Sequence, residues 1–179
     1  MKKMLFLLAA ALPALAQQNF DFKTLDKLSA KAKESNNITL DGDTLKLATG
    51  LLSDDQDSVK ALANNLTAVY VRNYEFERDG QYEQSDLDPF RIYVTSLQWS
   101  KIVDVKEDKE TSQIYVKPLP NNLIGGIAII NAEPREVSVV YITGMLSLSD
   151  ISKLSGNVGI PDMKFLLNGK PDKKATGKK

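Results

Sequence analysis

The feature that most constrains the fold is the run LIGGIAIINAEPREVSVVYITGML, which extends from Leu123 to Leu146. It contains two apolar stretches rich in isoleucine and valine, residues 124–131 and 136–143, separated by a polar turn at residues 133–136. β-Branched residues favour extended backbone, and a short polar turn between two such stretches is typical of an antiparallel hairpin. The run therefore predicts two adjacent strands of a β-sheet.

Further strands and helices follow from the spacing of apolar residues in the rest of the chain. Alternation at period two predicts strands over residues 67–78, 101–106 and 112–117, the last two joined by the charged turn EDKET. Apolar residues at helical spacing, together with candidate N-caps, predict helices over residues 22–33, after Asp43, after Asp55 or Asp57, from Ser85 or Asp86 to about Gln98, and from Ser147. The polar residues 35–37 are expected to end the first helix.

This order of elements predicts an α+β domain, with a mainly antiparallel sheet of about five strands and with helices packed on one face. Successive strands usually pair as a meander. The strand, helix and strand between residues 67 and 106 also allow one parallel pair, through a right-handed crossover.

Gly125 and Gly126 begin the apolar run, and glycine pairs can serve two different purposes. A loop that cradles phosphate places its glycines between a strand and the start of a helix. Here the residues IAII follow, which predict a strand. We therefore expect the pair to form a bulge or to allow close packing against a helix.

The two ends of the chain differ from its middle in composition. Lys2 and Lys3 precede an apolar run and the small-residue signal Ala14-Leu15-Ala16, a pattern that predicts a secretory signal peptide over residues 1–16, cleaved after Ala16. Residues 17–163 are expected to form a single α+β domain, and residues 164–179, with six lysines and one aspartate, a basic disordered tail. We expect an exported protein, periplasmic or secreted, without a transmembrane segment.

The chain carries 23 basic and 23 acidic residues, but their distribution is uneven. Without the signal peptide and the tail, the body has 15 basic against 22 acidic residues. An acidic body argues against nucleic acid as a partner. The lysine tail could make weak contact with an anionic lipid surface, although a solubilising role is favoured.

The chain contains neither histidine nor cysteine. Zinc sites, thiol catalysis and a Ser-His-Asp triad are therefore excluded, which leaves paired carboxylates or a lysine-activated serine for an enzyme. Glu75 and Glu77 lie two apart on one predicted strand, but glycosidase carboxylates flank their substrate from different elements, so a solvated strand face is favoured. The segments DGD and DDQD do not match a calcium loop, and helix capping accounts for them. We predict no catalytic residue, no metal and no cofactor.

A candidate ligand-binding face lies on the strand predicted over residues 67–78. Its members share one side of the strand because side chains alternate, and they are Tyr70, Arg72, Tyr74 and Phe76. Aromatic platforms of this kind can stack on RNA bases, but the glycine-bearing RNP1 pattern is missing. The rings are expected to pack beneath the helices with the arginines at the edge, and binding of a sugar or a peptide stays open.

The segments GGIAIINAEPREVSVVYITG and DISKLSGNVGIP resemble the C-terminal signature of a bacterial family known as domain of unknown function 4252. The segments LSDDQDSVKALANNLTAVYVRNYEFE and WSKIVDVKE are similar to the central region of that family, so the resemblance spans most of residues 25–161. It implies an exported protein of Gram-negative bacteria, sometimes encoded beside extracytoplasmic sigma-factor systems. It supplies no activity and no site residues.

Together these observations predict an exported, non-catalytic envelope protein, a periplasmic protein-interaction or regulatory module whose partner is another envelope protein. Two alternatives stay open. One is a carboxylate-dependent hydrolase of envelope glycans, and the other is a carrier of lipid or another hydrophobic ligand between the sheet and the helices. Exposed strand edges also allow pairing between two copies of the chain.

Overall fold

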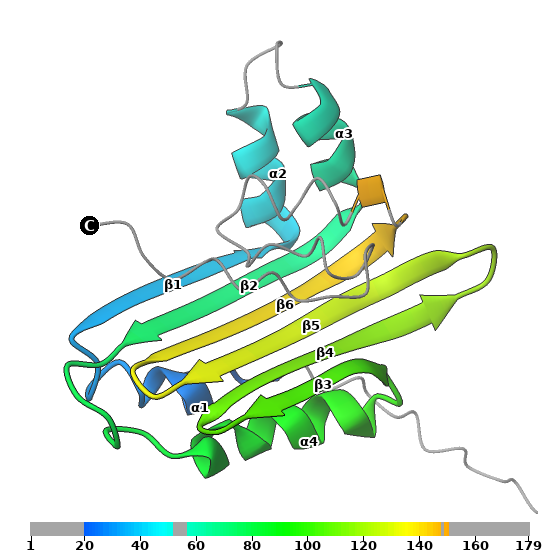
Figure 1. Ribbon diagram of the computed structural model, residues 1–179. Coiled ribbons are helices and arrows are strands. Elements are labelled where there is room, and N and C mark those ends of the chain that lie inside the picture. Colours follow the sequence, from blue (N-terminus) through cyan, green and yellow to red (C-terminus); the bar gives the residue numbers. More distant parts are fainter. Residues whose placement is uncertain (1–19, 52–56, 148, 151–179) are drawn as a thin grey trace, which may run out of the picture.

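The computed structural model describes residues 20–51, 57–147 and 149–150. At its centre is a six-stranded antiparallel sheet with the strand order β1-β2-β6-β5-β4-β3 (Figure 1). The strands are β1 (Glu34–Asp41), β2 (Leu66–Glu75), β3 (Ser100–Glu107), β4 (Glu110–Leu119), β5 (Leu123–Glu133) and β6 (Glu136–Leu146). The helices are α1 (Lys23–Asp26), α2 (Gly42–Gly50), α3 (Asp57–Asn64) and α4 (Asp88–Ser96), the last preceded by the 3₁₀ turn η2 (Gln84–Leu87). The predicted signal peptide and basic tail, and all but the start of the helix predicted from Ser147, lie outside the described residues.

The predicted α+β class and antiparallel sheet are confirmed, but the prediction of about five strands is wrong, because the sheet has six. The additional strand is β1, in a stretch that was expected to be a polar stop. Residues 34–37 are exposed, and only Ile38 and Leu40 of β1 are half-buried on alternate positions. β1 is an edge strand, and its pairing with β2 supplies the backbone hydrogen bonds that define it, so its sequence needs little apolar pattern.

The parallel pair allowed between residues 67 and 106 does not form. β2 pairs with β1 and β6, whereas β3 pairs with β4 at the opposite edge of the sheet, and each of these pairs is antiparallel. The reason lies in the hairpin of β5 and β6. Because β6 pairs with β2 from Glu136 opposite Glu75 to Gly144 opposite Leu66, it occupies the place that a parallel β3 would need.

Two helix boundaries also differ from the prediction. The helix expected over residues 22–33 is confined to α1, and the chain continues in turns, with Leu28 buried. The helix expected after Asp43 begins after Asp41, because the N–H of Asp41 donates to the Thr44 hydroxyl oxygen at 2.8 Å and that hydroxyl donates to the Asp41 carbonyl oxygen at 2.6 Å. Asp41 is therefore the residue at which β1 turns into α2.

The two faces of the sheet differ in composition. Because side chains alternate along β2, Tyr70 lies on one face and Val71 on the other. The first face is aromatic and is covered by α1 and α4, the latter through residues such as Phe90 (Figure 1). The second face is aliphatic and receives Leu62 from α3. The prediction that helices pack on one face holds for α1 and α4, whereas α2 and α3 stand at the end of the sheet next to β1 and β2.

Gly125 and Gly126 lie at a bulge in β5, as predicted. The register of β5 shifts at this point against both β4 and β6. A Cβ atom built on Gly126 would lie 2.5 Å from Cη2 of Trp99 and 2.8 Å from the carbonyl oxygen of Ile142. Trp99 lies between the end of α4 and the start of β3, so the close contact at Gly126 is with the segment that follows the helix and not with a helix.

We expect Gly126→Ala to lower the free energy of unfolding by about 1–3 kcal/mol, because the added methyl group overpacks a buried contact that includes backbone. Gly125→Ala is the matched control. Its added Cβ meets only the side chains of Lys117, at 3.0 Å, and Leu119, at 3.2 Å, and the lysine stem can move. Urea unfolding of both variants measures the difference. Equal midpoints for the two variants would contradict the assignment of tight packing to Gly126.

Candidate functional site

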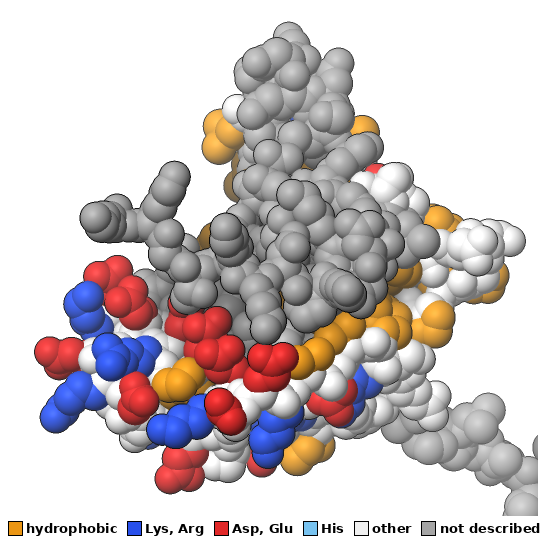
Figure 2. Space-filling model, viewed as in Figure 1, with side chains coloured by type: hydrophobic (Ala, Val, Ile, Leu, Met, Phe, Trp, Pro, Cys, Tyr) orange, Lys and Arg blue, Asp and Glu red, His pale blue; other side chains and the backbone are white. Residues whose placement is uncertain are grey.

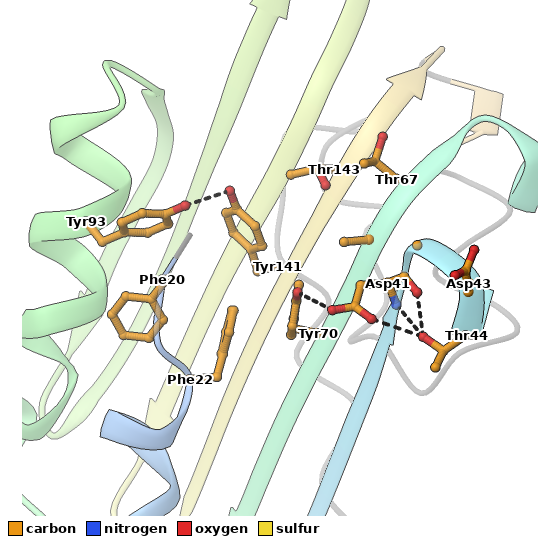
Figure 3. Close-up of a pocket in the computed structure, with 12 residues that line it drawn as sticks. Phe20, Phe22, Asp41, Asp43, Thr44, Thr67, Tyr70, Tyr93, Tyr141 and Thr143 are labelled. Atoms are coloured by element: carbon orange, nitrogen blue, oxygen red, sulfur yellow. Dashed lines mark hydrogen bonds between the residues drawn. The ribbon is translucent and has the colours of Figure 1, made fainter. Parts of the chain in front are cut away.

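A cleft of about 510 Å³ opens on the aromatic face, at the junction of β1 and α2. Figure 3 shows aromatic rings on one side of it and carboxylate and hydroxyl groups on the other. The rings belong to Phe20, Phe22, Tyr70, Tyr93 and Tyr141. The polar side chains belong to Asp41, Asp43, Thr44, Thr67 and Thr143. We call these two sets the ring wall and the acidic wall.

The ring wall is assembled from four separate parts of the chain. Phe22, which precedes α1, stacks on Tyr70 of β2 with ring centroids 4.3 Å apart and an interplanar angle of 6°. The ring centroid of Phe20 lies 5.2 Å from that of Tyr93 on α4, and the Tyr93 hydroxyl oxygen lies 3.3 Å from that of Tyr141 on β6. Offset and edge contacts between rings add to the free energy gained by burying them, so the wall is held in place by the core itself.

The start of α2 supplies the carboxylates and Thr44 of the acidic wall, and the strands β2 and β6 add Thr67 and Thr143. Oδ2 of Asp41 accepts a hydrogen bond from the Tyr70 hydroxyl group at 3.1 Å, which ties the two walls together (Figure 3). Oδ1 of Asp41 lies 3.1 Å from the Thr44 hydroxyl group, whose one proton is shared between this oxygen and the carbonyl oxygen of Asp41. Asp43 is exposed and pairs with Lys46 at 3.2 Å. The carboxylate of Asp41 is therefore fixed, whereas that of Asp43 is free to move with its lysine.

Burial and neighbouring groups raise the pKa values of two phenols of the cleft, those of Tyr70 and Tyr141. Burial raises the pKa of Tyr70 above its ordinary value, and the hydrogen bond and negative charge of Asp41 raise it further. The pKa of Tyr141 is raised by burial and by its hydrogen bond with Tyr93. At neutral pH both groups are uncharged hydroxyls, each able to donate and to accept one or more hydrogen bonds.

Of the four residues predicted to form a ligand-binding face, Tyr70 alone lines the cleft. Tyr74 is fully buried, and burial and the negative charge of Asp26 raise its pKa. Phe76 is buried and stacks on Tyr82 with centroids 5.0 Å apart. The expectation that the rings pack beneath the helices describes Tyr74 and Phe76, whereas Tyr70 is half-buried and reaches the cleft.

The prediction that Arg72 lies at the edge of the face is wrong. Arg72 is buried, with 6% of its surface exposed. Its Nε atom donates to Oδ1 of Asp26 at 2.9 Å, and its Nη1 atom donates to the carbonyl oxygens of Ile38 and Val71 at 2.8 and 2.9 Å. Its guanidinium carbon lies 5.2 Å from the centroid of the Phe22 ring. Arg72 is therefore a structural residue behind the ring wall, and a long side chain with this many internal acceptors does not need solvent.

Most of the cleft was missed by sequence reasoning, which named Tyr70 and treated the segment DGD only as a helix cap. By residue type, Phe20 and Tyr93 are expected in the hydrophobic core, and Tyr141 lies in an apolar strand. Strand pairing brings Tyr141 opposite Tyr70 in the β2–β6 register, and packing of rings brings Phe20 and Tyr93 beside them. The capping signal at Asp41 and Asp43 was the clue that could have placed a negative charge beside the strand.

The carboxylates predicted to lie on a solvated strand face are away from the cleft. Glu75 is exposed and lies 3.6 Å from Lys33, and Glu77 is exposed as well. Arg135 pairs with Asp79 at 3.0 Å. Figure 2 shows basic and acidic side chains interspersed over the end of the sheet where β1 begins. Among the residues that the structure describes, no three acidic side chains converge on a point where they could hold a metal ion. No helix in the described ranges is long and apolar enough to cross a membrane.

Comparison with known families agrees with the resemblance seen in the sequence. No curated protein and no solved structure matches the chain. The family model described as Domain of unknown function (DUF4252) matches residues 27–154. This range contains the whole of the sheet and the acidic wall of the cleft, and it is more than half of the chain. The protein therefore belongs to the DUF4252 family.

Proposed function

We propose that this protein is an exported, non-catalytic binding protein of the bacterial envelope, a periplasmic interaction or regulatory module that recognises its partner in the cleft. The cleft is the observation that carries the proposal, because its ring wall and the carboxylate of Asp41 are fixed by contacts within the chain. Phe22 is 6% exposed and stacks on Tyr70, and Tyr70 in turn bonds to Asp41. A pre-formed site loses little conformational entropy when it binds, which favours recognition.

The cleft supports binding better than hydrolysis of a glycan. Its two carboxylates, Asp41 and Asp43, both come from the start of α2. A glycosidase needs two carboxyl groups that face each other across the scissile bond, at a separation set by its mechanism, and a single turn of chain does not surround a sugar in this way. A lining with two carboxylates is also a poor environment for an acyl chain, because burial of carboxylates beside apolar groups is costly.

Export is supported by the signal-peptide pattern that ends at Ala16, and it completes the proposal. The experiment that tests both parts uses the full chain with a photo-crosslinking residue, benzoylphenylalanine, at one of two exposed positions. At position 67 the crosslinking residue replaces Thr67 in the cleft. At position 102 it replaces Ile102, which is 50% exposed on β3 at the far edge of the sheet. Envelope and cytoplasmic fractions of the irradiated cells are compared by mass spectrometry.

We expect a mature chain that begins at Gln17 in the envelope fraction, and a reproducible adduct from position 67 that position 102 does not give. A protein adduct would support an interaction module, and a glycan or lipid adduct would replace it with one of the two alternatives. An uncleaved chain that stays in the cytoplasm, or equal crosslinking from both positions, would overturn the proposal.

A further inference from the structure

The cleft has an excess of hydrogen-bond acceptors and of negative charge. The carboxylates of Asp41 and Asp43 accept hydrogen bonds and cannot donate them when ionised, and no lysine or arginine is among the described residues that line the cleft. The remaining polar groups are hydroxyls of threonine and tyrosine, which both donate and accept. A complementary ligand must therefore bring donors, and an anionic ligand would be repelled.

The charge of Asp41 is not balanced by a basic side chain within the described part of the molecule. Its carboxylate accepts hydrogen bonds from the neutral hydroxyl groups of Tyr70 and Thr44. Two basic residues on the neighbouring elements β2 and α2 pair with other carboxylates: Arg72 with Asp26, and Lys46 with Asp43. One full negative charge thus remains beside the aromatic rings.

The ring wall suits a cation as well. The faces of phenylalanine and tyrosine rings attract ammonium and guanidinium groups that approach within about 6 Å. The chain already provides an example, because the Arg72 guanidinium carbon lies 5.2 Å from the Phe22 ring centroid. Phe20, Tyr70, Tyr93 and Tyr141 form the rest of the wall, opposite the fixed carboxylate (Figure 3). Aromatic faces on one side and a carboxylate on the other are the two features that bind organic cations.

We infer that the cleft binds a protonated amine or a guanidinium group, supplied either by a free polyamine or by a lysine or arginine side chain of a partner protein. This inference rests on the proposed binding function and adds the chemical class of the ligand. The donors of the cation would bond to Asp41 and to the phenol oxygens, while its alkyl part would lie against the rings.

The test is a titration of ¹⁵N-labelled mature chain, residues 17–179, followed by NMR. The probes are spermidine, tetralysine, and tetralysine with all of its amines acetylated. The titrations are repeated on a chain whose six lysines in residues 164–179 are changed to glutamine, so that the tail cannot compete for the cleft. We expect spermidine or tetralysine to shift the amide signals of Asp41, Thr67 and Tyr70, and the acetylated peptide to leave them unchanged. Binding of tetralysine without spermidine would indicate a side chain of a partner, and the reverse a free amine.

Two variants locate the charge that is responsible. Asp41→Asn keeps a good helix N-cap and a side-chain oxygen but removes the charge, and it should weaken amine binding about fivefold or more. Asp104→Asn removes an exposed carboxylate on β3 that pairs with Lys101, and it should leave binding unchanged. Asp41→Asn could also alter the cap of α2, and a third variant avoids this because Thr67 lies on β2. Thr67→Arg places a guanidinium group at the cleft and should abolish amine binding.

The inference fails if the acetylated peptide binds as tightly as tetralysine, or if Asp41→Asn and Asp104→Asn have equal effects. A position-67 adduct with a partner, combined with no amine binding, would overturn the cationic ligand and leave the binding function standing. The absence of both would overturn the two proposals together.

Discussion

Phe90→Ala should lower the free energy of unfolding by about 3–5 kcal/mol, because it removes the ring that joins α4 to the aromatic face of the sheet. Phe90 is fully buried. Its ring centroid lies 5.1 Å from Phe20, 5.8 Å from Phe22 and 6.0 Å from Tyr141. These neighbours come from different elements and cannot all move inward, so the variant leaves a cavity that adds to the lost burial.

The matched control for Phe90→Ala is Ile92→Ala in the same helix. Ile92 is 67% exposed, and its replacement by a good helix former should change the free energy of unfolding by no more than about 0.5 kcal/mol. Urea unfolding followed by circular dichroism measures both. Because Phe20 and Tyr141 also line the cleft, Phe90→Ala should weaken binding there as well, at a temperature where the variant remains folded. A small effect on stability would mean that α4 is held to the sheet mainly by other contacts.

The parts of the fold that the sequence predicts are those whose signal is local. The hairpin of β5 and β6 is marked by two apolar stretches and a polar turn, and α4 by an acidic start and Phe90 and Val94 at helical spacing. β1 has neither kind of signal, because an edge strand is stabilised by its neighbour and can be polar. The helix expected over residues 22–33 fails for the opposite reason, because Leu25 and Leu28 are buried by tertiary contacts whether or not the turns between them are helical.

The candidate site depends even more on contacts between distant residues. Tyr70 could be singled out because a strand with three aromatic residues on one face is unusual. Its partners could not, because Tyr141 lies beside it only through the β2–β6 register, and Asp41 reaches it only because β1 exists. The same pairing buries Arg72, although arginine is a residue type that is mostly exposed. A strand pattern identifies a face, but the register decides which residues of that face meet a ligand.

The ion pair of Arg72 with Asp26 should show the second large effect on stability. Asp26→Ala is expected to lower the free energy of unfolding by about 2–3 kcal/mol, because it leaves a buried guanidinium group without its counter-charge. This loss of stability is smaller than the loss expected on breaking a fully buried ion pair, because the Asp26 side chain is 38% exposed. The other bonds of Arg72, to the carbonyl oxygens of Ile38 and Val71 and to the Thr39 hydroxyl group, involve neutral partners and remain.

A double-mutant cycle separates this mechanism from simple loss of contact. In an Arg72→Met background, Asp26→Ala leaves no buried charge without a partner, so it should lower the free energy of unfolding by less than about 1 kcal/mol. The coupling energy between the two positions should then exceed about 1 kcal/mol. Glu75→Ala, which breaks an exposed pair with Lys33, serves as the control and should change stability by no more than about 0.5 kcal/mol. If Asp26→Ala costs the same in both backgrounds, Arg72 is stabilised by its carbonyl acceptors and by the Phe22 ring rather than by the carboxylate. The guanidinium group would then already be bound as a cation by an aromatic ring of this core.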